Sequence, residues 1–439
     1  MGSERHSLRL EDCLDALIDY RGKTPRKAKH GIPLITAKVV KSGNIKTPDE
    51  FISEEDYNAW MTRGYPQVGD VVLTTEAPLG EVAQIKFLPV ALAQRIVTLR
   101  GKRCVLDSGY LLYLMQSQEM QEKLLGHSSG TTVVGIKQSE LRKIEVELPP
   151  FQEQRAIAHI LGTLDDKIEL NRRQNETLEA MARALFKAWF VDFVPVRAKM
   201  EGRWQRDQSL LGLPAHLYDL FPDRLVDSEL GEIPEGWGIV STKQLIEFNP
   251  SESLRKGEDA PYLEMAALPT SGCWPAPPVA RPFGSGTRFR NGDTLLARIT
   301  PCLENGKTAL VQCLPNNSIG WGSTEYIVMR PKKPVPPEFG YLLARDSAFR
   351  GQAIRSMTGT SGRQRAQVDA VGAFRLAAPA RESLWHEFSH VAGSFFTAIK
   401  SNSESIEALA QLRDTLLPEF ISGQLRVPDP RSLLEECDL

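Results

Sequence analysis

Hydrophobic and polar positions along the 439-residue chain follow one plan that occurs twice. The segment GDVVL at 69–73, a turn that enters an apolar strand, recurs as GDTLL at 292–296. GYLL at 109–112 recurs at 340–343 and opens an amphipathic helix in both places. A loop of small residues and a strand ending in proline close each copy, at 127–132 and 144–149 and again at 357–362 and 374–379. Four matches in the same order predict an internal duplication with a period of about 230 residues.

Short apolar runs within each copy predict β-strands. They are Ile32–Ile35, Val71–Thr74 and Ile96–Leu99 in the first copy, and Leu295–Ile299 and Tyr326–Met329 in the second. Because one or two helices accompany the strands, each copy is expected to be a mixed α/β unit, and the whole chain an α+β protein.

A long helix is predicted after each copy, because apolar residues there recur at steps of four and three. Spacing of 3.5 residues is typical of a coiled-coil seam. The predicted seam consists of Ile157, Leu161, Leu164, Ile168, Asn171, Leu178 and Leu185 in the first helix and Phe388, Phe395, Ile399, Asn402, Leu409 and Leu416 in the second. Asn171 and Asn402 occupy the same heptad position, where a buried amide fixes the register of a helix pair.

Neither helix could cover its apolar stripe alone, so each is expected to pack on the other. From Ile157 to Trp189 the first helix would be roughly 50 Å long. Since the chain must return between the two helices, an antiparallel pair that holds the two units apart in a pseudo-twofold repeat is the natural arrangement. Two separate coils that bind other proteins remain the alternative.

Composition predicts an ordinary globular protein, with 41% hydrophobic and 25% charged residues. The six cysteines include no C-x-x-C pair, which favours reduced thiols in a cytosolic chain. No run of about 18 apolar residues would span a membrane, and the first seven residues have no apolar core for a secretory signal. The expected location is therefore the cytoplasm.

A net charge of −2 gives little support for nucleic-acid binding, but the basic residues are segregated. Eight basic residues and no acidic residue lie between Tyr20 and Thr47. Arg350, Arg355, Arg363 and Arg365 lie between Ser347 and Val368, again without an acidic residue. Two such runs at matching places in a repeat are more than an ordinary solvated face.

Motifs of nucleotide-dependent or methyl-transfer enzymes are incomplete in this chain. Two Gly-Lys-Thr triplets, at 22–24 and 306–308, lack the earlier glycine of a phosphate-binding loop, since Leu17 and Pro301 stand there. LPPF at 148–151 lacks the polar residue that would bind the amino group of a base.

The sharpest enzymatic alternative is a zinc metalloprotease that uses His386, Glu387 and His390 as an H-E-x-x-H motif. Phe396 stands where the longer form of this motif needs a third histidine, and Phe388 belongs to the predicted seam. Two histidines on the surface of a helix are therefore the favoured interpretation.

Four segments resemble the specificity subunits of type I restriction-modification enzymes. They are SELGEIPEGW at 228–237, LPPFQEQRAI at 148–157, LFKAWFVDF at 185–193 and GTTVVGI at 130–136. The resemblance covers nearly the whole chain, but the second copy departs from it. There RESLWH at 381–386 replaces the junction before the helix, so the second unit is assigned mainly by the repeat.

The resemblance implies a non-catalytic chain in which two target-recognition domains each recognise one half of a split DNA site. Its partners would be double-stranded DNA, two methyltransferase subunits and restriction subunits. S-adenosylmethionine, ATP and magnesium would be bound by those subunits, and this chain would hold no cofactor. The expected division is recognition domains at 1–150 and 236–380, spacer helices at 151–193 and 381–425, a connector at 194–235 and a tail at 426–439.

Basic side chains would hold phosphates, and a few polar side chains would contact base edges. The candidates in the first domain are Arg21, Lys23, Lys38, Lys41, Thr131, Thr132 and Lys137. Those in the second are Arg288, Arg298, Arg363, Gln364 and Arg365. Each could instead be an ordinary surface side chain.

Aromatic residues near the end of the first helix allow two interpretations. Phe186, Trp189, Phe190 and Phe193 could be exposed anchors for a partner, or could pack in the core, which is favoured for Trp189. A structural coiled-coil adaptor with no role on DNA also remains open.

Overall fold

The computed structural model describes residues 5–41, 43–130, 133–360 and 362–436 and divides into two compact units. Unit 1 consists of Met1–Ile168 and Glu407–Leu439, and unit 2 of Glu169–Ile406. Two long helices, α6 (Phe151–Phe190) and α12 (Glu382–Ser422), each contribute one part to each unit. The mixed α and β content agrees with the α+β fold expected from the sequence.

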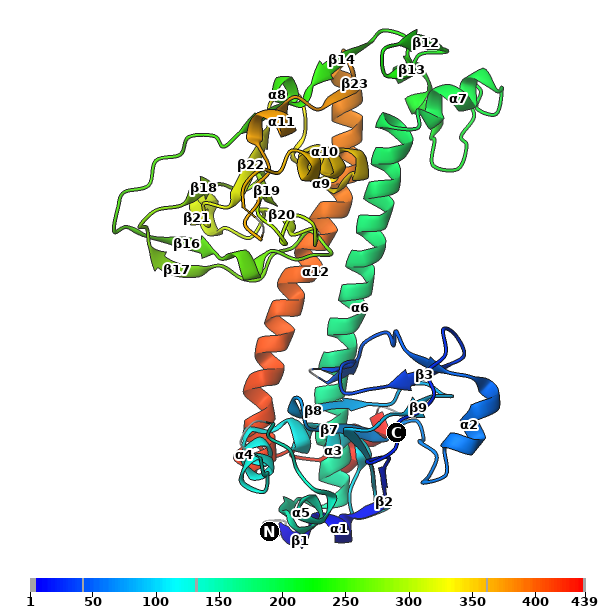
Figure 1. Ribbon diagram of the computed structural model, residues 1–439, viewed down its shortest axis with the longest axis vertical. Coiled ribbons are helices and arrows are strands. Elements are labelled where there is room, and N and C mark those ends of the chain that lie inside the picture. The colour runs from blue at the N-terminus through cyan, green and yellow to red at the C-terminus, as the bar shows by residue number, and fades with distance from the viewer. Residues whose placement is uncertain (1–4, 42, 131–132, 361, 437–439) are drawn as a thin grey trace. The chain divides into compact units, whose positions relative to one another are not determined.

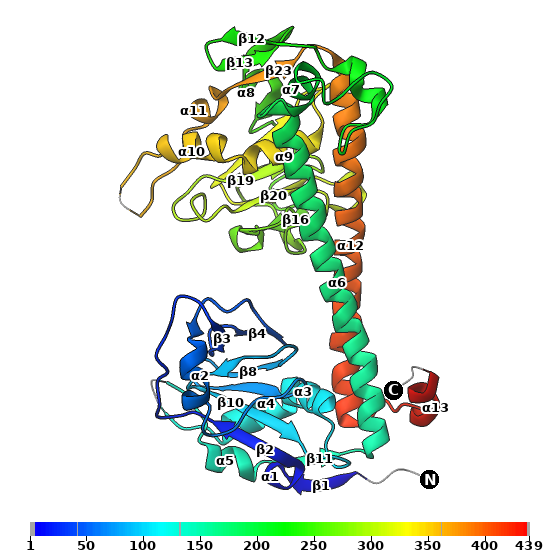
Figure 2. The same ribbon diagram turned by 90° about the vertical axis from the view of Figure 1, so that its right-hand side faces the viewer.

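Unit 1 is built on a four-stranded antiparallel sheet with the strand order β2-β10-β7-β8. These strands are β2 (Leu14–Asp19), β10 (Ile96–Gly101), β7 (Val71–Thr75) and β8 (Leu79–Gln84). Helix α3 (Ser108–Gln116) lies between this sheet and α6 (Figure 2). Tyr113 of α3 donates a hydrogen bond to Asp165 of α6 at 2.8 Å, which fixes the domain to the long helix.

Smaller elements complete unit 1. They are β1 (His6–Arg9), α1 (Leu10–Cys13), β3 (Ile32–Ile35), β4 (Val40–Lys41), β5 (Asn44–Ile45), β6 (Phe51–Ile52), α2 (Glu54–Trp60), β9 (Ala91–Leu92), α4 (Gln118–Gly126), α5 (Gln138–Lys143), β11 (Glu145–Leu148) and α13 (Pro430–Glu436). Strand β3 lies between β6 and β9, and β1 pairs with β11. The guanidinium of Arg5, just before β1, donates to the backbone carbonyls of Phe420 and Ile421 near the end of α12.

Unit 2 repeats the same sheet with the order β15-β22-β19-β20. Its strands are β15 (Ile246–Phe248), β22 (Tyr326–Pro331), β19 (Thr294–Ala297) and β20 (Thr308–Leu310). Helix α9 (Pro337–Arg345) lies between the sheet and the long helices, and α10 (Ser347–Arg355) packs on α9 (Figure 1). Tyr341 of α9 donates to Glu179 of α6 at 2.7 Å, as Tyr113 does to Asp165.

The other elements of unit 2 follow the order of unit 1, with additions. They are α8 (Thr242–Leu245), β14 (Trp237–Ser241), η2 (Met265–Ala267), β16 (Asp259–Leu263), β17 (Val279–Pro282), β18 (Thr287–Phe289), η3 (Pro315–Asn317), β21 (Gly320–Gly322), α11 (Val368–Gly372) and β23 (Arg375–Pro379). Strand β14 pairs with β23 as β1 pairs with β11. The duplication expected from the sequence is therefore present in the topology, and every predicted strand overlaps an observed one.

A buried ion pair recurs beside the two central strands of each sheet, where β7 and β19 begin. Asp70 is 1% exposed and accepts two 2.8 Å hydrogen bonds from Arg100. Asp293 is also 1% exposed and accepts bonds of 2.7 and 2.6 Å from Arg330. Each aspartate also accepts a hydrogen bond from the backbone N–H of the residue three positions earlier, which is Gln67 for Asp70 and Arg290 for Asp293. Such two-point pairing offsets the cost of removing both charges from water.

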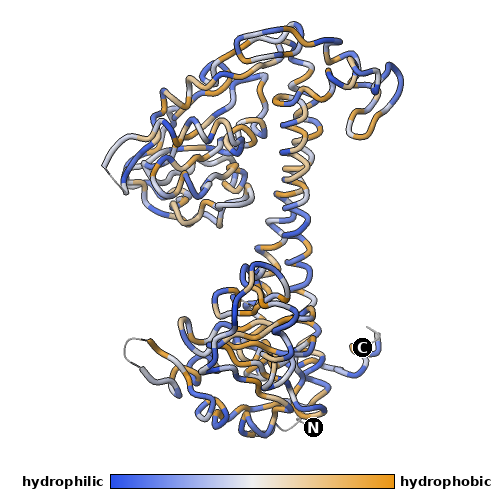
Figure 3. The backbone as a smooth tube through the Cα atoms, turned by 45° about the vertical axis from the view of Figure 1, so that its right-hand side comes forward, coloured by the Kyte–Doolittle hydropathy of each residue, from blue (hydrophilic) through white to orange (hydrophobic). Residues whose placement is uncertain are grey.

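Within each unit the α6 and α12 segments pack antiparallel. In unit 1, Ile157 and Leu161 share a core with Phe420 and Ile421, and Arg413 donates to Asp165 at 2.7 Å. In unit 2, the Asn171 amide donates to Ser405 at 3.3 Å and the Asn402 amide to Asn175 at 3.0 Å. Hydrophobic and hydrophilic positions alternate along both helices (Figure 3).

Exposure differs among the predicted seam residues. Ile157, Leu161, Ile168, Asn171, Phe388 and Ile399 are buried. Leu164, Leu178, Leu185, Phe395, Asn402, Leu409 and Leu416 are partly buried. Phe396, which the heptad pattern leaves out, is fully buried with its ring 5.6 Å from that of Tyr341, because α9 of unit 2 packs on that side of α12.

The aromatic residues at the end of α6 are buried, which contradicts the interpretation as exposed anchors. Phe186, Trp189, Phe190 and Phe193 are 4, 1, 4 and 8% exposed. Phe190 stacks on Trp385 of α12 with the ring centroids 5.2 Å apart. These rings fill the space between the two long helices and the second domain, and are therefore part of its core.

The segment 194–235 is more ordered than a polar connector needs to be. It contains α7 (Val194–Met200), η1 (Ala215–Leu220), β12 (Leu225–Ser228) and β13 (Gly231–Pro234). Trp204 and Phe221 are buried in the core of unit 2, with Phe221 packed edge-on against Trp189. None of the helices among the described residues combines the length and apolar character required to cross a membrane.

The buried Asp293–Arg330 pair should be essential for the stability of unit 2. We expect Asp293→Ala to lower the free energy of unfolding by about 3 kcal/mol, because the largely buried Arg330 guanidinium loses both hydrogen bonds to Asp293 and retains its ion pair with Glu252. Six of the seven tryptophans belong to unit 2, so tryptophan fluorescence during urea unfolding reports on that unit. Glu229→Ala, which removes an exposed partner of Arg375, is the matched control and should leave the midpoint unchanged. Equal midpoints for the two variants would contradict the prediction.

Candidate nucleic-acid interface

Three chain segments of unit 1 meet where β7 ends and β10 begins. The backbone N–H of Thr75 donates to the carbonyl of Arg95 at 2.9 Å, and that of Ile136 donates to Thr75 at 3.0 Å. Glu76 forms an isolated β-bridge with Gly135. The basic loop after β2 joins them, because the Arg21 guanidinium donates to the carbonyl of Ile136 at 2.8 Å.

A hollow of about 550 Å³ opens at this edge, and most of the charged residues in its lining are basic. Lys27, Lys38, Lys41 and Arg95 contribute to its lining, together with a single carboxylate, Glu50. Lys27 lies 2.7 Å from Glu50, and Lys38 pairs with Asp49. The hydrogen bond from Lys38 lowers the pKa of Asp49 and raises that of the lysine, so both remain charged at neutral pH.

The same three-segment junction occurs in unit 2. The N–H of Arg298 donates to the carbonyl of Glu325 at 2.9 Å, and that of Ala366 donates to Arg298 at 2.8 Å. Ile299 forms an isolated β-bridge with Arg365. By these hydrogen bonds, Thr75 corresponds to Arg298 and Arg95 to Glu325. The duplication therefore extends to the individual backbone contacts of this edge.

Each junction carries one arginine–carboxylate pair. In unit 1, Arg95 Nε lies 3.1 Å from Glu76 Oε1. In unit 2, Arg365 Nε lies 2.9 Å from both carboxylate oxygens of Glu325, and its Nη2 lies 2.6 Å from Oε1. The hydrogen bond from Arg365 lowers the pKa of Glu325, and the same bond raises the pKa of the arginine. The Arg365–Glu325 pair is accordingly ionised at neutral pH.

Several candidate residues hold the fold together. Arg21 is bound to the carbonyl of Ile136, and Arg298 donates to the carbonyl of Ala366 at 2.9 Å. Gln364 is partly buried, and its backbone carbonyl accepts a hydrogen bond from the backbone N–H of Thr300. Arg288 belongs to β18, and the central carbon of its guanidinium lies 5.7 Å from the centroid of the Phe283 ring. The side chains of Arg21 and Arg298 therefore help to hold the two junctions together.

Other candidates are open to solvent. Lys23, Lys41, Lys137 and Arg363 are exposed. Thr131 and Thr132 lie outside the described residues. The sequence reasoning omitted Arg95, Glu76 and Glu325, which the structure brings to the two junctions. Arg95 is a single basic residue just before the apolar strand β10, and Glu325 stands at the matching place before β22. This correspondence between the two copies is the one feature of the sequence that could have pointed to Arg95.

The H-E-x-x-H segment has the geometry of a packed helix. His386 and His390 are exposed, Phe388 is fully buried between them, and Glu387 lies 3.7 Å from His216. Among the described residues, no group of three or more histidine, cysteine, aspartate or glutamate side chains could hold a metal ion. The arrangement gives the zinc-protease alternative no support.

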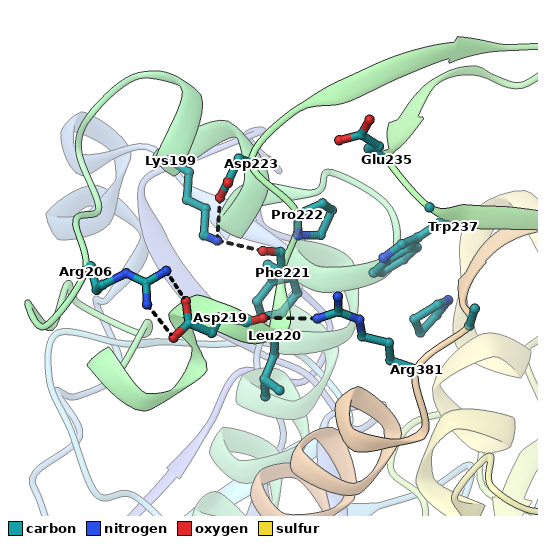
Figure 4. Close-up of a pocket in the computed structure, with 13 residues that line it drawn as sticks. Lys199, Arg206, Asp219, Leu220, Phe221, Pro222, Asp223, Glu235, Trp237 and Arg381 are labelled. Carbon is teal, nitrogen blue, oxygen red and sulfur yellow. Dashed lines mark hydrogen bonds and ion pairs between the residues drawn. The ribbon is translucent and has the colours of Figure 1, made fainter.

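A second hollow, of about 380 Å³, lies in unit 2 between the 194–235 segment and the start of α12 (Figure 4). Its basic groups bind carbonyls and carboxylates of the same unit. Lys199 donates to the carbonyl of Phe221 at 2.6 Å and to Asp223 at 2.9 Å, and Arg206 pairs with Asp219. The Arg381 guanidinium donates to the carbonyl of Asp219 at 3.3 Å. These contacts attach the segment to the unit and do not form a basic surface like that at the junctions.

Comparison with known proteins agrees with this architecture. Residues 9–180 match the family model described as the type I restriction modification DNA specificity domain. The MjaIX specificity subunit of Methanocaldococcus jannaschii is 27% identical over 428 residues, which cover 91% of this chain and 88% of that protein. The HindI specificity subunit of Haemophilus influenzae is 24% identical over 72% of this chain and 77% of its own length.

A solved structure has the same fold. The crystal structure of the type I restriction-modification S subunit from M. genitalium aligns with a TM-score of 0.59 at 14% identity, covering 95% of this chain and 96% of that one. The duplicated units, the long helices and the sequence similarity along both copies lead to one conclusion. Residues 9–180 match the type I DNA specificity domain, and over most of its length the chain is similar to type I restriction-modification specificity subunits.

Proposed function

We propose that the two units recognise the two halves of a split DNA site, one half each, and that the chain itself performs no catalytic step. The observation that carries this proposal is the repeated junction of three segments, which exposes an arginine–carboxylate pair in both units and is accompanied by lysine side chains in unit 1. Basic groups hold phosphates, and arginine donors contact base edges in the major groove. Two similar surfaces in one chain suit a site of two parts.

The proposed partners are double-stranded DNA, two methyltransferase subunits and restriction subunits. Methyl transfer would use S-adenosylmethionine, and cleavage would use ATP and magnesium, all bound by those subunits. The two long helices, each of which passes from one unit into the other, would set the distance between the half-sites. Type I specificity subunits, to which this chain is similar, are the basis for proposing these partners.

The function is tested by mapping methylated adenines in cells that express this chain together with the methyltransferase subunit encoded beside it. The expected result is a two-part motif with a constant unspecified gap that disappears when this chain is omitted. Efficient expression of both proteins without new methylation would contradict the proposal. Salt-independent or undetectable DNA binding by the purified complex would favour a structural adaptor.

Removing exposed lysines from the junction of unit 1 should weaken DNA binding without changing the recognised sequence. We expect Lys23→Ala with Lys41→Ala to reduce affinity for all duplexes about equally, because phosphates carry no sequence information. The slope of log affinity against log salt should become shallower by about 0.9 for each phosphate that the variant no longer neutralises. Lys102→Ala with Arg103→Ala, exposed beyond the opposite end of β10, is the matched control. A similar drop in affinity in the control would place the binding surface elsewhere.

Lengthening the helix pair should change the gap of the recognised site. Insertion of one heptad into both α6 and α12, near Ile168 and Glu407, preserves the seam period and adds about 10 Å. Methylation mapping should then show both half-sites intact and separated by about three more base pairs, at 3.4 Å per pair. The same motif with an unchanged gap would exclude the helices as the spacer.

A further inference from the structure

Each junction carries an arginine–carboxylate pair that is partly open to solvent. Resting on the proposed function, we infer that each half-site contains a guanine that is contacted by a carboxylate-supported arginine, Arg95 in unit 1 and Arg365 in unit 2. Glu76 and Glu325 hold these side chains in place and are positioning residues. The inference deepens the proposed function by assigning one base and one reader to each half.

Each carboxylate binds its arginine in a way that leaves donors of the guanidinium free to contact guanine. In both pairs the carboxylate takes the Nε side of the guanidinium. A guanidinium has five donors in one plane, so the opposite edge, formed by the two terminal nitrogens, keeps its own pair of parallel N–H groups. That edge matches the O6 and N7 acceptors of guanine in the major groove. Adenine presents one acceptor and one donor there, which this all-donor edge cannot satisfy.

The two pairs are accessible. The side chains of Arg95 and Glu76 are 55 and 36% exposed, and those of Arg365 and Glu325 are 45 and 21% exposed. Arg95 also lines the basic hollow together with Lys38 and Lys41. An ion pair this exposed contributes little to stability, whereas fixing a flexible arginine before DNA arrives reduces the entropy lost on binding. The backbone bonds of the junction already connect the same segments.

Duplication alone does not explain why both junctions hold such a pair. The arginine of unit 1 precedes β10, but its counterpart in unit 2 is Glu325. The arginine of unit 2, Arg365, belongs to the segment after α10 and forms an isolated β-bridge with Ile299. The residue at the matching place in unit 1 is Gly135, which forms the same bridge with Glu76. The same ion pair is thus assembled from different positions of the repeat. A shared requirement at this edge accounts for that better than inheritance of a common residue.

The test uses the complete complex of this chain with its methyltransferase subunit and the motif found by methylation mapping. Arg95→Lys and Arg365→Lys keep the charge and the ion pair but lose the two-point edge. Each variant should relax the preference for one guanine, Arg95→Lys in one half-site and Arg365→Lys in the other. The half-site left unchanged serves as the control for folding and assembly in each variant.

A binding measurement remains decisive if a variant methylates too little DNA to map. Replacing the contacted guanine with 7-deazaguanine removes N7 and should weaken binding by the wild-type complex about 5- to 150-fold. The same replacement should have almost no further effect on the matching lysine variant, because its side chain no longer makes the two-point hydrogen bond to that base. Glu76→Gln and Glu325→Gln should give smaller decreases in affinity, confined to the same guanine.

The outcomes separate the inference from the function on which it rests. A split motif whose guanine preferences survive both lysine substitutions, with 7-deazaguanine equally harmful to wild type and variant, would overturn the inference and leave the proposed function intact. A half-site without a guanine on either strand would also overturn it. Failure of the wild-type complex to produce any split motif would refute the proposed function itself.

Discussion

An amphipathic helix of 40 residues cannot cover its own apolar side, and α6 is such a helix. In both units it lies against α12, with Ile157 and Leu161 packed near Phe420 in one unit and Trp189 and Phe190 near Phe388 in the other. Each recognition domain then packs on the paired segments through a tyrosine that donates to a carboxylate of α6. Helix pairing thus determines where the domain core can form, and the sheet and its loops are arranged around it.

Charges inside the domains are also placed according to burial. Asp70 and Asp293 are almost fully buried and receive two hydrogen bonds each from one arginine, so their charges are compensated. The arginine–carboxylate pairs at the junctions are more open and keep donors for a second contact. One type of ion pair therefore stabilises the sheet when it is buried and can present a donor edge when it is exposed.

Local patterns predicted much of the fold. The strands, the duplication and the antiparallel long helices follow from apolar spacing, which records burial directly. The candidate site was less accessible to such reasoning, because a basic residue has the same local signature whether it binds a carbonyl, as Arg21 and Arg298 do, or faces solvent, as Lys41 does. Arg95 and Glu76 meet only after β7 and β10 have paired. The burial of the aromatic residues near the end of α6 could not be predicted from the helix pattern either, because the second domain covers them as well as α12.

Unit 1 is assembled from two segments that lie far apart in the sequence, and this has a consequence during synthesis. Its core contains Phe420 and Ile421, whose carbonyls accept hydrogen bonds from Arg5. A ribosome releases the first residues long before those of α12, so the first domain leaves the ribosome with part of its apolar surface uncovered. Unit 2 is continuous in sequence and has no such delay. The amino-terminal half is therefore the part that most needs a chaperone until translation ends, and a truncated chain would leave it open to aggregation.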